Sequence, residues 1–431
     1  MVQLNKSVSL NMDVRGMEQS ATIAINDRCR ELQSEGRMVY RLGLGQSPFP
    51  VPKPVVDALK LHAHEKAYLP ARGLRELRRA VAEFHRRHDG VEALPENVMV
   101  GPGSKELMFL LQLVYYGQLL VPTPCWVSYI PQAQIVGRKI GLIPTTFETC
   151  WQVTAEQLRQ RFEGQHDPYR PRILVLNYPG NPHGCTYSAE ELQDLAEVCN
   201  KYEMVILSDE IYGQTHYKGE HVSMARYCPE RTIISSGLSK WCGAGGWRLG
   251  TFTFPSSLDW LRDAMIAVAS ETYTSVSAPI QYAAVRAFMG GTDIERYLWH
   301  SRRILDDLGH RLARMLAEAG ARVHPPDGAF YLFPDFSPLR EKLAARGIND
   351  AVTMCEKLLE DTGVAVLPGR DFGRPPEELT ARMAFVDFDG AKALTASERI
   401  PLDQPLPDDF ADTWCHNVLS GVRLLVDWVK K

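Results

Sequence analysis

The chain contains no uninterrupted apolar run approaching the roughly 18 residues that a membrane-spanning helix needs. Its first residues, MVQLNKSVSLNMD, lack the basic segment and apolar stretch of a secretory signal peptide. Long runs of like charge are absent as well, and the net charge is only -4, so nothing predicts binding to nucleic acid or to an anionic membrane. We therefore expect a soluble cytoplasmic protein.

Paired cysteine motifs are also missing. The nine cysteines are scattered between Cys29 and Cys415, their number is odd, and no two of them form a CxxC pair. This usage favours reduced thiols over a disulfide framework. Because no Cys or His residues stand at zinc-ligand spacing near another such pair, we expect no metal site.

The regular alternation of elements is the main indication of fold class. With 431 residues and 45% hydrophobic content, the chain can bury the cores of two or three domains. Between 118 and 254, short apolar strands alternate with amphipathic helices, which predicts an α/β fold with a mostly parallel sheet. The predicted strands are 118–121, 139–143, 172–177, 204–208, 232–236 and 249–254, and the predicted helices are 154–162, 188–202 and 257–269.

The last third of the chain has a different pattern. A long helix is predicted over 293–319, followed by a mixture typical of a smaller α+β domain. We expect strands at 322–324, 329–333, 364–367 and 381–386, helices at 350–362 and 412–429, and a Pro-rich, charged loop over 395–409. The expected division is an N-terminal arm with part of the small domain over 1–49, a large domain over 50–318 and a C-terminal small domain over 319–431.

Three polar segments follow strands of the predicted sheet. They are NYPGNPHG over 177–184, DEIY over 209–212, and SSGLSKWCGAGGWRLG over 235–250, which carries Lys240 and Arg248. Because ligands of open parallel sheets bind beyond the carboxyl ends of the strands, these segments are expected to converge on one site.

An amine at a strand end, with hydroxyls and a guanidinium close by, suits a phosphorylated carbonyl compound. Lys240 would form the imine, while Arg248 and a hydroxyl would hold the phosphate. The glycines at 243, 245 and 246 would let the backbone pass close to a bound group. A solvated surface lysine in a flexible loop is the alternative for Lys240 alone.

Other side chains suit an aromatic aldehyde such as pyridoxal. Asp209 can stabilise a pyridinium nitrogen, Asn181 or Tyr212 can donate to the phenolate oxygen, and Trp126 can stack on the ring. Each also has an ordinary role open to it, as a helix cap, a turn residue or core packing. Ser104 likewise has two possible roles. It stands between Gly103 and Lys105 at a helix start, where it can bind an anion or act as an N-cap.

Taken together, SSGLSKWCGAGGWRLG, NYPGNPHG and SDEIY resemble the class I/II aminotransferases, the fold-type I enzymes that depend on pyridoxal 5'-phosphate. The resemblance runs from about Gly43 to Arg382. Within the family, the chain resembles the bacterial-type aspartate and aromatic aminotransferases. It implies a large domain with a mostly parallel central sheet between helices, plus a smaller α+β domain.

The resemblance also implies roles for individual residues. Lys240 would be the Schiff-base lysine, Asp209 the partner of the pyridine nitrogen, Trp126 the stacking ring and Arg248 the phosphate arginine. The remaining implied cofactor residues are Asn181 and Tyr212 at the phenolate oxygen, and Gly103, Ser104 and Lys105 in the phosphate-binding turn.

Two further segments imply contacts with a partner and with the substrate. AYLPARGLRELR resembles the segment whose tyrosine, here Tyr68, reaches the phosphate of a neighbouring subunit, which implies a homodimer with active sites at the interface. LTARMAFVDFDG resembles the segment whose arginine, here Arg382, binds the substrate α-carboxylate through two hydrogen bonds. Gly45 matches a glycine whose backbone touches the same carboxylate, and Asn181 is expected beside it.

Some residues depart from the family pattern. His183 stands where a threonine is usual, and Gly237 stands where a serine often supplies a phosphate hydroxyl, so Ser239 or Ser236 would have to replace it. Trp241 and Cys242 beside the lysine, and the extended segment 391–409, are also unusual.

The sequence thus predicts a pyridoxal-phosphate-dependent aminotransferase that moves an amino group from an L-amino acid to a 2-oxo acid such as 2-oxoglutarate by a ping-pong mechanism. Lys105 stands where some aspartate-using members of the family carry a lysine that binds the side-chain carboxylate, so the resemblance implies a dicarboxylic donor such as aspartate or glutamate. A solvent-facing lysine at a helix start is nearly as compatible with its position. A C-S β-lyase using the same cofactor residues is the alternative, and a cofactor-sensing non-enzymatic domain ranks lower.

Overall fold

The computed structural model describes residues 10–164, 167 and 170–431. The predicted absence of a signal peptide rests partly on residues 1–9, which lie outside the described part of the chain. No helix among the described residues is both long enough and apolar enough to cross a membrane.

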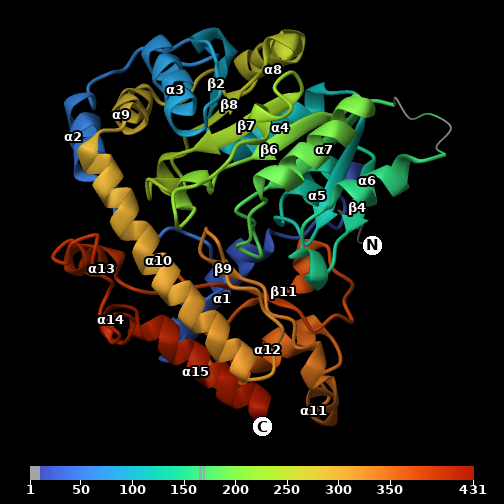
Figure 1. Ribbon diagram of the computed structural model, residues 1–431, viewed down its shortest axis with the longest axis vertical. Helices are drawn as coiled ribbons and strands as arrows, with labels where there is room; N and C mark the ends of the chain where they lie inside the picture. The colour runs from blue at the N-terminus through green and yellow to red at the C-terminus, as the bar shows by residue number, and fades with distance from the viewer. Residues whose placement is uncertain (1–9, 165–166, 168–169) are drawn as a thin grey trace, which may run out of the picture.

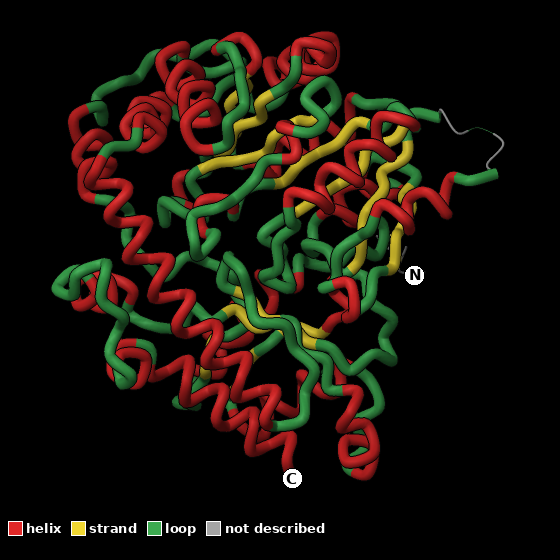
Figure 2. The backbone as a smooth tube through the Cα atoms, viewed as in Figure 1, coloured by secondary structure: helices red, strands yellow, loops and turns green. Residues whose placement is uncertain are grey.

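A seven-stranded sheet forms the centre of the larger half of the molecule (Figures 1 and 2). Its strands in spatial order are β2 (Val98–Gly101), β8 (Gly250–Thr253), β7 (Thr232–Gly237), β6 (Val205–Asp209), β5 (Arg172–Asn177), β3 (Gln118–Thr123) and β4 (Ile140–Pro144). The neighbours from β7 to β4 run parallel, and β8 is antiparallel to both β7 and β2. The prediction of a mostly parallel sheet is confirmed.

Alternate strand residues build separate cores on the two faces of this sheet. Leu174 and Leu176 of β5 belong to the core with α6 and α7, whereas Ile173 and Val175 belong to the core with α4, α5 and α8. Because both faces are covered, the strands are apolar throughout rather than alternating. The helices of this half are α2 (Lys53–Leu61), α3 (Arg75–His88), α4 (Ser104–Val114), α5 (Tyr129–Ile135), α6 (Ala155–Phe162), α7 (Ala189–Lys201), α8 (Asp259–Glu271) and α9 (Ala278–Met289).

The smaller half contains two short sheets and several helices. One sheet has the antiparallel order β11-β12-β9, and in the other β1 pairs in parallel with β10. The elements are α1 (Ala21–Ser34), β1 (Tyr40–Arg41), β9 (Tyr331–Leu332), α11 (Arg340–Ala345), α12 (Ala351–Thr362), β10 (Val364–Ala365), β11 (Leu367–Pro368), β12 (Ala381–Ala384), α13 (Gly390–Ser397), α14 (Phe410–Trp414) and α15 (His416–Lys430). The β1–β10 pair joins the N-terminal segment to the C-terminal part. The expected division of the chain into domains stays a prediction.

Helix α10 (Thr292–Glu318) runs from the larger half into the smaller one (Figure 1). Its 27 residues span about 40 Å at the usual rise per residue. The buried side chains Leu308, Leu312 and Leu316 lie in one continuous core with α15 and β9. The predicted long helix over 293–319 is confirmed.

Three local predictions need correction. The expected strand at 322–324 is reduced to an isolated bridge between Arg322 and Asp335. The expected helix over 412–429 is divided at Cys415 into α14 and α15, and the expected loop over 395–409 begins inside α13. At its carboxyl end, α13 is held by Arg303 of α10, whose guanidinium donates to the carbonyls of Ile400 (2.8 Å) and Pro401 (3.0 Å).

Candidate active site

A cavity of about 440 Å³ opens at the carboxyl edge of the central sheet, where the larger and smaller halves meet. It is lined by eleven of the predicted site residues, namely Gly45, Ser104, Lys105, Trp126, Asn181, Asp209, Tyr212, Ser239, Lys240, Arg248 and Arg382. The predicted convergence of the three strand-end segments is therefore observed. Two predicted site residues do not line the cavity, namely Gly103, which precedes Ser104 in the chain, and Tyr68.

Lys240 follows the end of β7 and reaches across the cavity. Its Nζ donates to the carbonyl oxygen of Gly45 at 2.7 Å, and lies 5.4 Å from the ring centre of Tyr212 and 5.6 Å from that of Phe330. The amine is only partly buried and faces the cavity rather than bulk solvent. This placement excludes the alternative of a surface lysine in a flexible loop.

The glycines after Lys240 differ in their surroundings. Gly243 adopts a φ of +66°, and an added Cβ would lie 2.5 Å from the carbonyl oxygen of Phe49. Gly246 has open space around it, since no described atom lies within 4 Å of an added Cβ. The glycine at 243 therefore lets the loop pack against the segment around Phe49, and the close approach of this loop to a bound group stays a prediction.

Asp209 is buried at the end of β6, and its carboxylate accepts hydrogen bonds from Tyr129 Oη (2.6 Å) and Ser235 Oγ (3.1 Å). Burial raises the pKa of this carboxyl to about 6, although both hydrogen bonds and the nearby Lys240 oppose the shift. A buried carboxylate of this kind is stabilised by an incoming cation. Tyr129 and Ser235 were not identified from the sequence, because a tyrosine in a helix and a serine in a strand carry no local signal of such a role.

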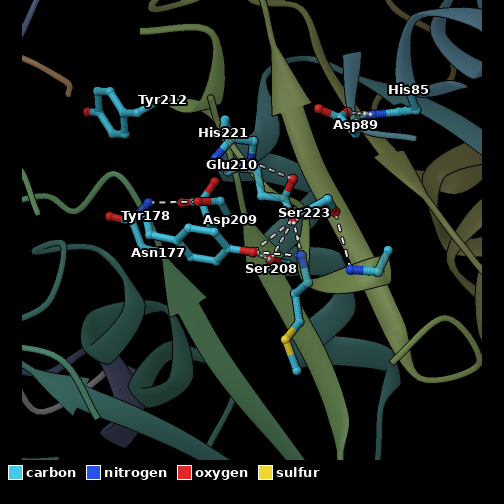
Figure 3. A network of polar contacts seen from close by, with 12 residues as sticks. His85, Asp89, Asn177, Tyr178, Ser208, Asp209, Glu210, Tyr212, His221 and Ser223 are labelled. Atoms are coloured by element: carbon cyan, nitrogen blue, oxygen red, sulfur yellow. Dashed lines mark hydrogen bonds and ion pairs between the residues drawn. The ribbon is translucent and has the colours of Figure 1, made fainter. Parts of the chain in front are cut away.

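The next residue, Glu210, anchors the DEIY segment from the opposite side (Figure 3). Its carboxylate accepts from Ser208 Oγ (2.7 Å) and Ser223 Oγ (2.8 Å), and it contacts His221 Nε2 at 2.9 Å. The His221 ring lies against Gly213, where an added Cβ would meet Cδ2 at 2.8 Å. Buried hydrogen bonds therefore fix the backbone on both sides of Tyr212.

The same region holds the one group of potential metal ligands found among the described residues. Ligand atoms of Asp89, Glu210 and His221 lie within 4.8 Å of one another. The carboxylates already have partners, since Glu210 is bound by His221 and Asp89 contacts His85 Nδ1 at 2.6 Å. The absence of a metal site stays a prediction.

A group of cationic and hydroxyl side chains forms one end of the cavity. Arg248 donates to the carbonyl of Gly245 at 2.9 Å, and Ser104 begins α4, where free backbone N–H groups favour an anion. An added Cβ on Gly103 would lie 2.2 Å from Arg248 Nη2, so only glycine leaves room for the guanidinium at this turn. This end has the donors that a phosphate needs.

The missing serine at position 237 has a steric explanation. An added Cβ on Gly237 would lie 2.8 Å from the carbonyl oxygen of Leu249 and 3.0 Å from the Cα of Gly250. Ser236 is buried in β7, while Ser239 lines the cavity. Of the two serines expected to replace the lost hydroxyl, Ser239 is therefore the one that faces the site.

Trp126 and Lys105 lie beside each other at the cavity wall. Lys105 Nζ is 5.2 Å from the Trp126 ring centre, and Trp126 packs edge-on against Tyr129 with ring centres 5.3 Å apart. Burial, together with the positive charges of Arg248 and Lys240, lowers the pKa of the Lys105 amine. The cavity thus disfavours the charged form of this amine, and an anion bound beside it would offset the effect.

Arg382 forms the opposite end of the cavity. It is almost fully buried and donates to Asn181 Oδ1 at 3.2 Å and to the carbonyl oxygen of Gly43. Its guanidinium lies 4.9 Å from the Tyr331 ring centre and 5.0 Å from that of Phe372, and its Nε has no hydrogen-bond partner among the described residues. A buried guanidinium with a spare donor suits an incoming carboxylate.

Tyr331 connects the two ends, although it was not singled out from the sequence. Its hydroxyl is 2.7 Å from that of Tyr212, and an added Cβ on Gly45 would lie 2.0 Å from it. Gly45 is thus required by the approach of Tyr331. Other lining residues that sequence reasoning missed are Thr22, Leu44, Asn177 and Ile211, of which Asn177 had been noted only as the end of a strand.

His183, the departure in NPHG, is buried behind Asn181. Its Nδ1 accepts a hydrogen bond from the backbone N–H of Cys185 at 3.1 Å, and its ring lies against Gly180. Burial lowers the pKa of this imidazole to about 3. His183 is therefore a neutral packing residue and does not reach the cavity.

Tyr68 is 89% exposed and is not among the residues lining the cavity. Its predicted reach toward the phosphate of a neighbouring subunit stays a prediction.

The residues around the cavity fit pyridoxal 5'-phosphate. Gly103 leaves the space that the phosphate-side guanidinium needs, Asp209 is a buried carboxylate bound by two hydroxyl groups, and Lys240 faces the same cavity. When bound, pyridoxal 5'-phosphate withdraws electrons from the carbon attached to its imine nitrogen.

Comparison with known proteins agrees with this geometry. The family model for aminotransferases of class I and II matches residues 37–388. The aspartate aminotransferase of Bacillus subtilis is 32% identical over 375 residues, covering 84% of this chain and 91% of the relative. The asparagine–oxo-acid transaminase of Streptococcus mutans is 31% identical, covering 85% of this chain and 92% of the relative.

Solved structures agree as well. The aspartate aminotransferase of Thermus thermophilus with maleate has a TM-score of 0.79 and 31% identity, covering 90% of this chain and 98% of that one. The enzyme from Rhizobium meliloti also has a TM-score of 0.79, with 26% identity. These matches favour amino transfer over the C-S β-lyase and over a non-enzymatic role. The chain therefore belongs to the class I and II aminotransferases, enzymes that depend on pyridoxal 5'-phosphate.

Proposed function

We propose that this aminotransferase takes its amino group from L-aspartate or another dicarboxylic amino acid and passes it to a 2-oxo acid such as 2-oxoglutarate. The observation that carries this proposal is the placement of two cationic side chains, Arg382 and Lys105, in the cavity that the Lys240 amine faces. Arg382 offers its guanidinium at one end, and Lys105 presents an ammonium at the other wall. Two carboxylates of one substrate can be bound at the same time.

Each residue has a task that follows from its position. Arg382 and the backbone near Gly45 hold the α-carboxylate, and Asn181 orients the guanidinium through its 3.2 Å contact. Lys240 Nζ, freed by the incoming amine, takes the proton from the substrate α-carbon and returns a proton on the opposite step, acting as general base and then general acid. With the cofactor bound, Asp209 would hold its protonated ring nitrogen, and Arg248, Ser104 and Ser239 would hold its phosphate.

The relatives support the choice of donor. The Bacillus subtilis and Thermus thermophilus proteins are named aspartate aminotransferases, and a Thermus thermophilus relative at 32% identity is named an aspartate/prephenate aminotransferase. We also propose a cytoplasmic homodimer, in which the exposed Tyr68 of each subunit reaches the phosphate end of the other site. The exposure of a large aromatic side chain supports this assignment.

The donor is tested by comparing aspartate, alanine and phenylalanine with 2-oxoglutarate as acceptor, in the wild type and in Lys105→Ala and Lys105→Met. We expect kcat/KM for aspartate to fall by roughly 10- to 100-fold in both variants, as for the loss of one charged hydrogen bond. The values for alanine and phenylalanine should change by less than about threefold. Equal losses for all three donors would show that Lys105 does not read the second carboxylate.

A further inference from the structure

A buried arginine of the smaller half lies against the ends of two strands of the larger half. Arg374 belongs to the loop 369–374, and its side chain is 7% exposed. Its Nη1 donates to the carbonyl oxygens of Thr123 (2.8 Å), at the end of β3, and of Thr145 (2.9 Å), directly after β4. Its Nε and Nη2 donate to the two carboxylate oxygens of Glu378, at 2.8 and 2.7 Å. One guanidinium thus joins the two halves.

The surroundings of this guanidinium select arginine. Its planar fork binds the Glu378 carboxylate through two parallel hydrogen bonds, while the remaining nitrogen reaches both carbonyls. The guanidinium also lies 5.0 Å from the ring centre of Trp151. A lysine has a single nitrogen and cannot reproduce this fork. Arg374 does not line the active-site cavity, so contact with a substrate does not account for its contacts.

The loop 369–374 also holds the segment that carries Trp126. Cys125 N donates to the carbonyl oxygen of Phe372 at 2.9 Å, so the residue before Trp126 is bound directly to the smaller half. An added Cβ on Gly373 would lie 2.9 Å from a methyl group of Thr123, because the loop approaches the end of β3 closely. Trp126 lines the cavity three residues beyond that strand end, and its position therefore depends on the loop as well as on β3.

The same loop supports Arg382. The ring centre of Phe372 lies 5.0 Å from the Arg382 guanidinium. Gly369 N, at the start of the loop, donates at 2.8 Å to the carbonyl oxygen of Thr380, two residues before Arg382. One short loop therefore contacts both the segment of Trp126 and the buried arginine at the carboxylate end.

We propose that Arg374 is a positioning residue for amino transfer, which holds the loop 369–374 against β3 and β4 and thereby fixes Trp126 relative to Arg382. The proposal rests on the roles proposed for Trp126 at the cofactor ring and for Arg382 at the substrate α-carboxylate. Loss of the guanidinium removes four hydrogen bonds, so the loop can shift along the strand ends while both halves stay folded. A misplacement of about 1 Å in such a site costs up to about 10²-fold in rate.

The first test compares the kinetics of the wild-type holoenzyme with those of Arg374→Met and Arg374→Lys. In Arg374→Met, kcat/KM should fall by about ten- to hundredfold, equally for aspartate and alanine, because the α-carboxylate is common to every donor. KM should rise more than kcat falls. The visible absorbance of the bound cofactor should stay, whereas its visible circular dichroism should change because Trp126 moves. Arg374→Lys should lie between the wild type and Arg374→Met.

The second test does not depend on turnover. Hydrogen–deuterium exchange, read by mass on peptides containing 125–128, should be at least about tenfold faster in Arg374→Met, because the Cys125 amide loses its fixed acceptor. Arg138→Met is the matched control, since its guanidinium also donates to two carbonyls, both in α4 (2.6 and 3.0 Å) and within the larger half. Arg138→Met should leave this exchange and kcat/KM unchanged.

Unchanged exchange at 125–128 in Arg374→Met would overturn the proposal. A lower Tm with unchanged kcat/KM would overturn it as well, since that is the result of a purely structural role. If Arg374→Met does not fold, Arg374→Lys and Glu378→Gln carry the same measurements, and each should raise KM by at least about threefold. The role of Arg382 is tested separately: an unchanged KM in Arg382→Gln would remove that role, while the exchange at 125–128 would still decide whether Arg374 holds the loop.

Discussion

The two ends of the active-site cavity are built in different ways. The cofactor end comes from residues at or directly after the ends of strands of one sheet, with Asp209 at the end of β6, Ser239 and Lys240 after β7, and Ser104 at the start of α4. The carboxylate end is assembled from Gly43 and Gly45 near the N-terminus, Asn181 in the middle and Arg382 near the C-terminus. The first depends on the sheet alone, whereas the second depends on how the two halves meet.

Substitutions at the two ends of the cavity should therefore have different effects. A change at the cofactor end should remove the cofactor signal together with activity, because we propose that the groups there hold the cofactor. A change at the carboxylate end should leave the cofactor in place and weaken only the binding of substrate. Tyr331 bridges the ends through its contacts with Tyr212 and Gly45, so its replacement should give a mixture of both effects.

The largest effect is expected for Lys240→Ala. Loss of the amine removes both the attachment of the cofactor and the group that moves the α-proton, so turnover should fall by at least about 10⁴-fold. The visible absorbance of the lysine-bound cofactor should vanish, as measured by spectrophotometry. An unchanged spectrum in Lys240→Ala would remove the lysine from its assigned role.

Arg382→Gln tests the other end. The variant loses a buried charge and the donors for the α-carboxylate, so kcat/KM should fall by roughly 10²- to 10³-fold for every amino donor. The absorbance of the bound cofactor, and the fraction of cofactor that stays bound after dialysis, should match those of the wild type. If the cofactor were lost instead, the two ends would not be separable in the way described.

Tyr331→Phe should have a smaller effect, because it removes one hydroxyl and keeps the ring under the Arg382 guanidinium. Loss of the 2.7 Å contact with Tyr212 should lower kcat/KM by about three- to tenfold. Tyr212→Phe and the double variant complete a cycle whose effects should be less than additive. Additive losses would mean that the two hydroxyls act independently.

The smallest expected effect concerns stability and compares two buried histidines near the site. For His221, burial opposes the charge, but the hydrogen bond with Glu210 outweighs it and the pKa is raised. Its stabilisation is therefore complete below the unfolded value of about 6.5 and is lost as the pH rises through the folded pKa. His183, with its pKa lowered to about 3 by burial, stabilises above about 6.5 and loses this effect as the pH falls.

Thermal unfolding of His221→Gln and His183→Gln between pH 5 and 9 checks both signs. Relative to wild type, the Tm deficit of His221→Gln should shrink as the pH rises, and that of His183→Gln should shrink as the pH falls, each by about 1–2 °C. Parallel pH curves for the two variants would contradict the assigned charges.

The sequence predicts the cofactor end well because its parts are contiguous. A lysine, a carboxylate or an asparagine placed directly after an apolar strand can be located at the carboxyl edge of the sheet from the residue pattern alone. Tyr129, Ser235 and Tyr331 could not be found in this way, since their roles arise only where separate elements come within hydrogen-bonding distance. The short strand expected at 322–324 failed for a similar reason: its single partner, Asp335, is set by the local chain path and supports only a bridge.

Helix α10 ends at the expected boundary at 318, which stays a prediction, and it joins the two halves of the protein. Its last turns place Leu308, Leu312 and Leu316 in the same core as α15, so a fragment beginning at 319 would expose the surface that these side chains cover. Neither half is then an independent folding unit. Heating should therefore melt the two halves in one cooperative transition, and movement between them must come from bending of a continuous helix rather than from a free linker.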